Sequence, residues 1–162
     1  MPAADGFTLM ELLVVLVIIG LGIATAVIAL RPDPRGLVRE EGNRLAVLLG
    51  LAAEESTLGG VAMAWVGRAD GYEFQARELT DSGPDWRVLR GDDLLRPRQL
   101  PDGASIRAIR VDGKALEPGQ RVALGSRGAV ALSVEIGLGE VRARVTGADG
   151  RFQSALLAEG ES

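Results

Sequence analysis

The chain contains no cysteine and no histidine among its 162 residues. Without cysteine, no disulfide can form, and neither thiolate catalysis nor a cysteine-bound metal is available. Without histidine, the chain lacks the commonest general base, the usual metal ligand and any serine–histidine nucleophile pair. We therefore expect no cofactor and no enzymatic activity, although carboxylates and lysine alone can support catalysis in other proteins.

Aromatic residues are also scarce, and the net charge is small. Only 4% of the residues are aromatic, so the core should rely on leucine, valine, isoleucine and alanine. The net charge of −4 gives no electrostatic reason to expect a nucleic-acid partner. A chain of this length suits one modest domain with a real hydrophobic core, together with an appendage.

Charge is absent altogether between Leu12 and Leu30, where Thr25 is the only polar side chain. A helix of these 19 residues would span about 28 Å, close to the ~30 Å hydrocarbon core of a bilayer. A buried helix of a soluble domain normally keeps one polar face, and this stretch has none. The sequence therefore predicts a helix over residues 7–30 that spans the lipid bilayer.

A cleaved secretory signal is an alternative interpretation of the same stretch. Such signals begin with basic residues and carry an apolar run of roughly 7–15 residues. Here the run is longer, and the residues before Phe7 include Asp5 but neither lysine nor arginine. We therefore expect the segment to remain as an anchor. Arg31, Arg35 and Arg39 follow it, so the positive-inside rule alone would place the C-terminal domain in the cytoplasm.

The residues Gly6–Glu11, GFTLME, stand directly before the apolar run. This arrangement resembles the N-terminus of type IV pilins and of type II secretion pseudopilins. The resemblance implies that a prepilin peptidase cuts between Gly6 and Phe7, removes residues 1–6 as a leader, and methylates the new terminal amine of Phe7. Leaders of that family usually carry lysine or arginine, and residues 1–5 carry neither, so either orientation is set elsewhere or translation starts upstream.

Glu11 is a carboxylate at the entrance of the apolar segment. A charged carboxylate in the membrane costs about 2.5–3.5 kcal/mol at a helix centre and less near an end. The resemblance implies that Glu11 pairs with the positively charged amine of Phe7 on the adjacent subunit and helps to set subunit register in a helical filament. The alternative is a carboxylate that reaches the lipid headgroups.

Two prolines follow the apolar segment, so the helix should kink or break over residues 31–36. A helical pattern resumes from about Leu37 to Leu58 and should end at Gly59-Gly60. Its apolar positions share one face: Val38, Leu45, Leu48, Leu49 and Ala52. Its polar residues lie mostly elsewhere: Arg39, Glu40, Asn43, Arg44 and Glu54. This pattern predicts an amphipathic helix that packs against its own domain.

Beyond this helix, apolar and polar residues alternate with a period of two. The alternation predicts strands at 72–77, 130–136 and 141–145, and further strands are expected near 61–66, 86–89, 104–111 and 121–124. Turn sequences from Gly137 and Gly147 make residues 129–157 a three-stranded meander. The predicted fold class is α+β and pilin-like: a membrane-spanning helix continues into an amphipathic helix packed on antiparallel sheet, with residues 37–162 as the globular domain.

The segment from Asp70 to about Phe152 resembles the GspH-type minor pseudopilins of type II secretion, the GspH/FimT-like group. The resemblance rests on the strand around Trp86, the link LLRPRQLPDG at 94–103, and the glycine-containing turn before the strand around Val130. It implies a non-enzymatic subunit of the secretion pseudopilus that aids export of folded proteins across the outer membrane.

The same resemblance implies a location and a set of partners. The chain would be a single-pass inner-membrane protein with its C-terminal domain in the periplasm, in conflict with the charge rule. Its partners would be other major and minor pseudopilins, the prepilin peptidase and the inner-membrane secretion platform, with no nucleic acid among them.

A minor type IV pilin, used in adhesion, motility or DNA uptake, is the main alternative. Many type IV pilins close a C-terminal loop with a disulfide, which this chain cannot form. A DNA-receptor pilin should present a basic surface, whereas residues 37–162 hold 16 basic and 19 acidic residues, a net charge of −3. A membrane-anchored periplasmic enzyme is a third alternative, against which the lack of histidine argues.

Two groups of charged side chains could suggest ligand sites in the globular domain. Asp92-Asp93, and Asp81 with Asp85, lack the spacing of a calcium loop, so we expect solvated turns and no bound metal. An arginine group could contact phosphates: Arg87, Arg90, Arg96 and Arg98. Because the aspartates interleave with these arginines, we predict a surface of mixed charge instead.

Overall fold

The computed structural model describes the backbone of residues 9–29, 33–125 and 131–158, and the side chains of the same residues except 23–29. The chain divides into two units, Met1–Asp33 and Pro34–Ser162. The first unit contains helix α1, and the second contains helix α2 and all the strands.

Helix α1 spans Leu9–Ala29 and is built almost entirely from aliphatic residues. Glu11 is the acidic residue in its first turn, where a carboxylate interacts favourably with the positive end of the helix dipole. Its described large apolar side chains, between Leu9 and Leu21, are all exposed.

Helix α2 spans Pro34–Gly59 and so begins three residues earlier than the sequence pattern predicted. Proline is well tolerated at the first helical position, because its missing amide hydrogen has no partner there in any helix. The helix ends where predicted, since Gly60 adopts a left-handed conformation with φ of 69°. The five apolar positions predicted on one face are all buried.

The first sheet has the strand order β3-β2-β1-β7. Strand β4 pairs with Gly71 and Tyr72 of β2, whereas β3 pairs with the later part of β2, from Gln75 to Thr80. Its strands are antiparallel: β1 Met63–Arg68, β2 Gly71–Thr80, β3 Gly83–Val88, β4 Arg98–Gln99 and β7 Arg121–Leu124. The predicted strands near 61–66, 72–77, 86–89 and 121–124 are thereby confirmed. The two-residue strand β4 carries too short a pattern to be recognised from sequence.

The second sheet has the order β10-β9-β8-β5-β6 and is also antiparallel. Its strands are β5 Ala104–Val111, β6 Lys114–Ala115, β8 Leu132–Leu138, β9 Val141–Ala148 and β10 Arg151–Leu156. The predicted meander is confirmed as β8–β9–β10, although Ala129 and Val130 lie outside the described residues. Asp149 and Gly150 form the last hairpin turn with φ of 53° and 77°, the left-handed pair that a two-residue hairpin requires.

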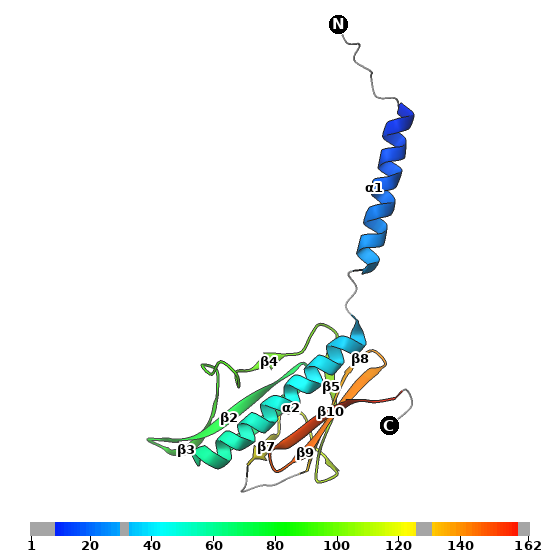
Figure 1. Ribbon diagram of the computed structural model, residues 1–162. Helices are drawn as coiled ribbons and strands as arrows, with labels where there is room; N and C mark the ends of the chain where they lie inside the picture. The colour runs from blue at the N-terminus through cyan, green and yellow to red at the C-terminus, as the bar shows by residue number, and fades with distance from the viewer. Residues whose placement is uncertain (1–8, 30–32, 126–130, 159–162) are drawn as a thin grey trace. The chain divides into compact units, whose positions relative to one another are not determined.

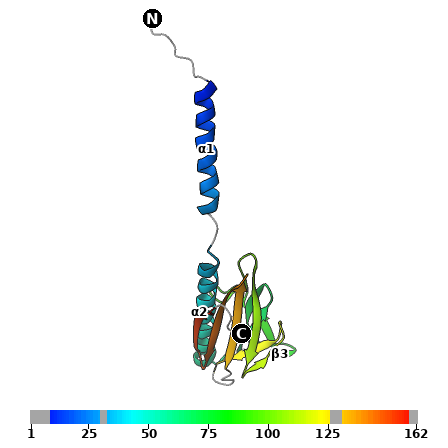
Figure 2. The same cartoon turned by 90° about the vertical axis from the view of Figure 1, so that its right-hand side faces the viewer.

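The core of the second unit lies between α2 and the inner faces of the two sheets. Helix α2 runs beside β9 and β10 and also contacts β1 and β7, as Figures 1 and 2 show. Leu45 and Leu49 of α2 are fully buried there. The expectation of an aliphatic core needs one addition, because Trp65 and Phe74 are the two largest fully buried side chains. The α+β, pilin-like fold class is confirmed.

Candidate functional site

The residues predicted to be processed and to set filament register are Gly6, Phe7 and Glu11. Gly6 and Phe7 lie outside the described residues, so their placement is untested. Glu11 lies in the first turn of α1 and its side chain is exposed.

The surface of α1 is apolar on every side that the structure describes. The exposed fractions of its large apolar side chains run from 43% for Val15 to 85% for Leu9. Within the described part of the chain, no helix combines the length and the apolar composition needed to cross a membrane. The membrane span predicted over residues 7–30 extends beyond the side chains described and stays a prediction.

A polar group on the buried face of α2 was not predicted from the sequence. Glu41 is only 4% exposed, on the same helix face as the apolar stripe. Its Oε1 accepts a hydrogen bond from Arg44, and its Oε2 is buried with no hydrogen-bond partner among the described residues. The Tyr72 hydroxyl and the Arg98 Nε are also buried and have no hydrogen-bond partner among the described residues. We name Glu41, Arg44, Tyr72 and Arg98 the buried polar cluster.

The strands explain how the buried polar cluster forms. Tyr72 and Arg98 face each other in the pairing of β2 with β4. Gly71 permits this close pairing, because a Cβ there would collide with the Arg98 carbonyl oxygen. The spacing Val38, Glu41, Leu45 also places Glu41 on the buried stripe, since residues three and four apart share a helix face. That spacing was the available sequence signal.

Burial controls the protonation of the cluster. Burial raises the pKa of the Glu41 carboxyl above its usual range, and the charges of Arg44 and Arg98 oppose that rise. Burial, together with the negative charge of Glu41, raises the pKa of Tyr72 to about 12. Tyr72 therefore stays neutral at physiological pH. Glu41 and Tyr72 are buried, whereas the Arg44 side chain is 40% exposed, so the cluster has a structural role where α2 meets the first sheet.

The charged groups weighed as ligand sites have local structural roles. Asp92 Oδ1 accepts hydrogen bonds from the amides of Leu94 and Leu95, both at 2.7 Å, which closes a turn. Asp85 Oδ1 accepts a hydrogen bond from the Trp86 amide at 2.8 Å. No group of three potential metal-ligating side chains occurs among the described residues. The four arginines at 87, 90, 96 and 98 were predicted to lie on the surface, but the Nε of Arg98 is buried.

Comparisons with known proteins agree with the N-terminal motif and the fold. Residues 1–27 match the family model described as the prokaryotic N-terminal methylation motif. The chain is 34% identical over 111 residues to type II secretion system protein H of Aeromonas hydrophila. That alignment covers 67% of this chain, and the chain spans only 58% of that relative's length.

Two solved structures of the minor pseudopilin EpsH, from the type II secretion system of Vibrio cholerae, are similar in fold. Their TM-scores are 0.59 and 0.57, with sequence identities of 22% and 20%. Each alignment covers 80% of this chain and 99% of the EpsH chain. The resemblance to the GspH-type minor pseudopilins is confirmed: the chain carries the prokaryotic N-terminal methylation motif and has their fold.

Proposed function

We propose that the chain is a minor pseudopilin, a non-enzymatic subunit of the type II secretion pseudopilus that aids export of folded proteins across the outer membrane. The observation that carries this proposal is the combination, in one chain, of the methylation motif over residues 1–27 with similarity to protein H of a type II secretion system. Its partners would be other pseudopilins and the inner-membrane secretion platform.

Processing at the N-terminus forms part of the proposal. A prepilin peptidase would cut between Gly6 and Phe7 and methylate the amine of Phe7. Glycine suits the position before the cut, because a missing side chain lets the backbone enter a tight active site. Residues 7–30 would then anchor the chain in the inner membrane, with the domain from Pro34 onward in the periplasm. The uncovered apolar surface of α1 supports this location, since it is more stable in lipid than in water.

Glu11 would pair with the terminal amine of Phe7 on the adjacent subunit. Its position supports this role: it lies four residues after Phe7, in the first turn of α1, where the apolar surface begins. A carboxylate and an amine attract strongly in a poorly solvated place, and a subunit in the wrong register would leave both charges buried without compensation.

The processing proposal is tested by co-expression with a prepilin peptidase and intact-mass spectrometry. The wild-type chain should lose residues 1–6 and gain one methyl group at Phe7. Gly6→Val should block cleavage by crowding the peptidase site, whereas the control Ala3→Val should be cleaved normally. A wild-type product that retains Met1, or one cut beyond Leu30, would contradict the proposal.

The location is tested by fusing reporters to the C-terminus in a type II secretion host. An alkaline phosphatase fusion should be active, because that enzyme folds only in the oxidising periplasm. An inactive phosphatase together with a fluorescent cytoplasmic reporter would show that Arg31, Arg35 and Arg39 set the orientation instead.

The role of Glu11 is tested with Glu11→Gln, which removes the charge and keeps the shape. The variant should be inserted and cleaved, but its copurification with partner pseudopilins should fall by roughly one to two decades, and secretion with it. Glu55→Gln on α2 is the matched control and should assemble normally. Equal recovery of Glu11→Gln and wild type would favour a carboxylate at the lipid headgroups. Copurification with type IV pilins in place of pseudopilins would favour the alternative function.

A further inference from the structure

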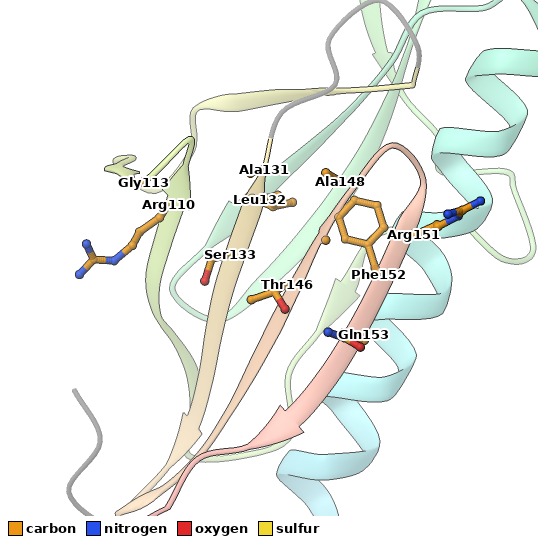
Figure 3. A pocket seen from close by; sticks show the side chains of 11 residues that line it. Arg110, Gly113, Ala131, Leu132, Ser133, Thr146, Ala148, Arg151, Phe152 and Gln153 are labelled. Atoms are coloured by element: carbon orange, nitrogen blue, oxygen red, sulfur yellow. The ribbon is translucent and has the colours of Figure 1, made fainter.

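The outer face of the second sheet, which points away from α2, carries a row of polar side chains across four strands. Ser133 of β8 pairs with Arg110 of β5 and with Thr146 of β9, and Thr146 pairs with Gln153 of β10. Directly paired residues of an antiparallel sheet point to the same side. Figure 3 shows Arg110, Ser133, Thr146 and Gln153 following one another across these strands.

This row borders an open cavity of about 620 Å³ at the end of the sheet where the β5–β6 and β9–β10 turns lie. Arg110 and Arg151 lie on opposite sides of the cavity in Figure 3, and Phe152 lies between them. The cavity therefore has hydroxyl and amide groups on its floor and an arginine at each of two edges, with the guanidinium groups directed away from Ser133 and Thr146 in Figure 3.

Three more arginines lie on the same outer face of the second sheet. Arg144 pairs with Glu135 in the next row, and its Nη2 donates to Glu135 Oε1 at 2.9 Å. Arg142 pairs with Gly137 one row further. The Arg107 side chain lies over Gly137, with its Cγ 3.2 Å from the position that a Cβ would take there. We name Arg107, Arg110, Arg142 and Arg144 the basic sheet face.

The basic sheet face has an excess of positive charge at short range. Glu135 is the acidic residue in the paired rows that carry these arginines, and it already forms an ion pair with Arg144. The other three arginines are exposed, and none forms an ion pair with any residue that the structure describes. The chain as a whole nevertheless has a net charge of −4. Because the Debye length is about 8 Å at physiological salt, a ligand seated on this face responds mainly to the local positive charge.

We infer that the basic sheet face and its cavity bind an acidic, extended segment of a partner protein. Carboxylates of the segment would pair with the exposed guanidinium groups of Arg107, Arg110 and Arg142, as arginine favours bidentate contacts with carboxylate. Ser133, Thr146 and Gln153 would hydrogen-bond to its peptide groups. The inference goes beyond the proposed function, which does not say which face of the domain meets a partner.

The acidic residues around the basic sheet face favour a protein segment over nucleic acid. Asp112 and Asp149 lie in the hairpin turns at one end of the sheet, and Glu140 lies in the turn at the other end. A nucleic-acid backbone carries a phosphate charge along its whole length, so a strand running past this face would meet these carboxylates. A short peptide can place its carboxylates between them.

The test uses the full-length chain in detergent and a fluorescein-labelled decapeptide of alternating glutamate and serine. Fluorescence anisotropy should detect binding that weakens with added salt. The double variant Arg110→Gln/Arg142→Gln should weaken binding roughly threefold to tenfold, since each exposed pair contributes modestly. The control Arg77→Gln/Arg90→Gln removes the same charge from the first sheet and its flank, and should leave binding unchanged.

Because the chain has no cysteine, Ser133→Cys creates a unique labelling site beside the cavity. A fluorophore there should respond to the peptide, which places the ligand on the basic sheet face. No binding, equal weakening by the two double variants, or an unresponsive label would each overturn the inference. A short DNA duplex that binds more tightly and displaces the peptide would also overturn it, in favour of a nucleic-acid ligand.

Discussion

Helices α1 and α2 have similar lengths, 21 and 26 residues, but opposite relations to solvent. Helix α2 buries its large apolar side chains against two sheets, with Leu45 and Leu49 at 0% exposure. Helix α1 exposes its apolar side chains in every direction described, and none of those between Leu9 and Leu21 is less than 43% exposed. A short helix gains most of its stability from packing an apolar face. Helix α2 finds that packing within its own unit.

The two helices therefore differ in their structural roles. The second unit is a domain with its own core, to which α2 contributes a structural face. The exposed apolar surface of α1 is larger than the apolar patches that monomeric soluble proteins normally expose. Apolar surfaces of that size typically contact a membrane or other subunits. Equivalent substitutions in the two helices should therefore have unequal effects on the stability of the domain.

The largest difference is expected for leucine truncation. Leu49→Ala should lower the free energy of unfolding of the domain by about 2–5 kcal/mol, because it removes a fully buried side chain and leaves a cavity. Leu16→Ala in α1, where the side chain is 60% exposed, should leave domain unfolding unchanged. Urea denaturation of the two variants in detergent, followed by the fluorescence of Trp65 and Trp86 of the domain, measures both. Equal losses would mean that the two units unfold as one.

A smaller difference is expected for glycine replacement. A Cβ at Gly42 would collide with Ser154 Oγ and lie 3.3 Å from the Cβ of Ala143, whereas Gly20 in α1 has open space. The hydroxyl of Ser154 can rotate away, but the Ala143 methyl group cannot. Gly42→Ala should therefore destabilise the domain by about 1 kcal/mol, after the gain in helix propensity offsets part of the crowding. Gly20→Ala should not destabilise it, and a stabilising Gly42→Ala would show that α2 can shift outward.

Most of the fold was accessible from sequence because its elements carry strong periodic patterns. The five apolar positions of α2 and the alternation in β2, β8 and β9 all report the buried faces directly. What the patterns missed are the features that depend on distant pairing. Strand β4 has two residues and exists because Gly71 allows Arg98 to approach Tyr72. No local period encodes such a contact.

Buried polar groups were the other gap, because an alternating pattern assigns polar residues to the surface. Gln75 is a polar residue of the alternating stretch 72–77, yet it is only 7% exposed. Its side chain donates to Glu73 at 2.9 Å and accepts from Arg121 Nε at 2.7 Å, and Arg121 also lies over the Trp86 ring. The bond from Arg121 joins Gln75 of β2 to β7, so a hydrogen bond that only the tertiary fold supplies helps to make the burial possible. The N-terminal motif, by contrast, is local and was read from six consecutive residues.

The buried carboxylate of α2 provides a third comparison, this time with solution pH. Burial raises the pKa of Glu41 in the folded state, whereas in the unfolded chain the value should be about 4.3. The folded state then binds more protons than the unfolded state above pH 4.3, so this residue makes stability fall as pH rises through that window to the raised pKa. Glu41→Gln should remove this contribution, so the stability of the variant relative to wild type should rise as pH increases from about 4.3 to the raised pKa of Glu41.

Urea denaturation of wild type and Glu41→Gln at several pH values in that window measures the difference. The absolute stability of the variant also depends on its weaker bond to Arg44, so the informative quantity is how the difference changes with pH. A difference that is independent of pH would show that Glu41 ionises in the folded domain as readily as in water.

The smallest effect is expected for Glu40, whose carboxylate contacts the same arginine from the solvent side. Arg44 Nη2 donates to Glu40 Oε1 at 2.8 Å in an i, i+4 pair whose side chains are 40% and 67% exposed. Water and salt screen such a pair, and Arg44 keeps its bond to Glu41 when Glu40 is replaced. Glu40→Gln should therefore cost only about 0.3–0.5 kcal/mol at low salt, and the cost should vanish in concentrated salt. It should leave the pH dependence that Glu41 confers almost intact, although the neighbouring charge of Glu40 contributes slightly to raising the pKa of Glu41. If Glu40→Gln instead matched Glu41→Gln in both size and pH profile, the two carboxylates would act as one unit, and burial would no longer explain the behaviour of Glu41.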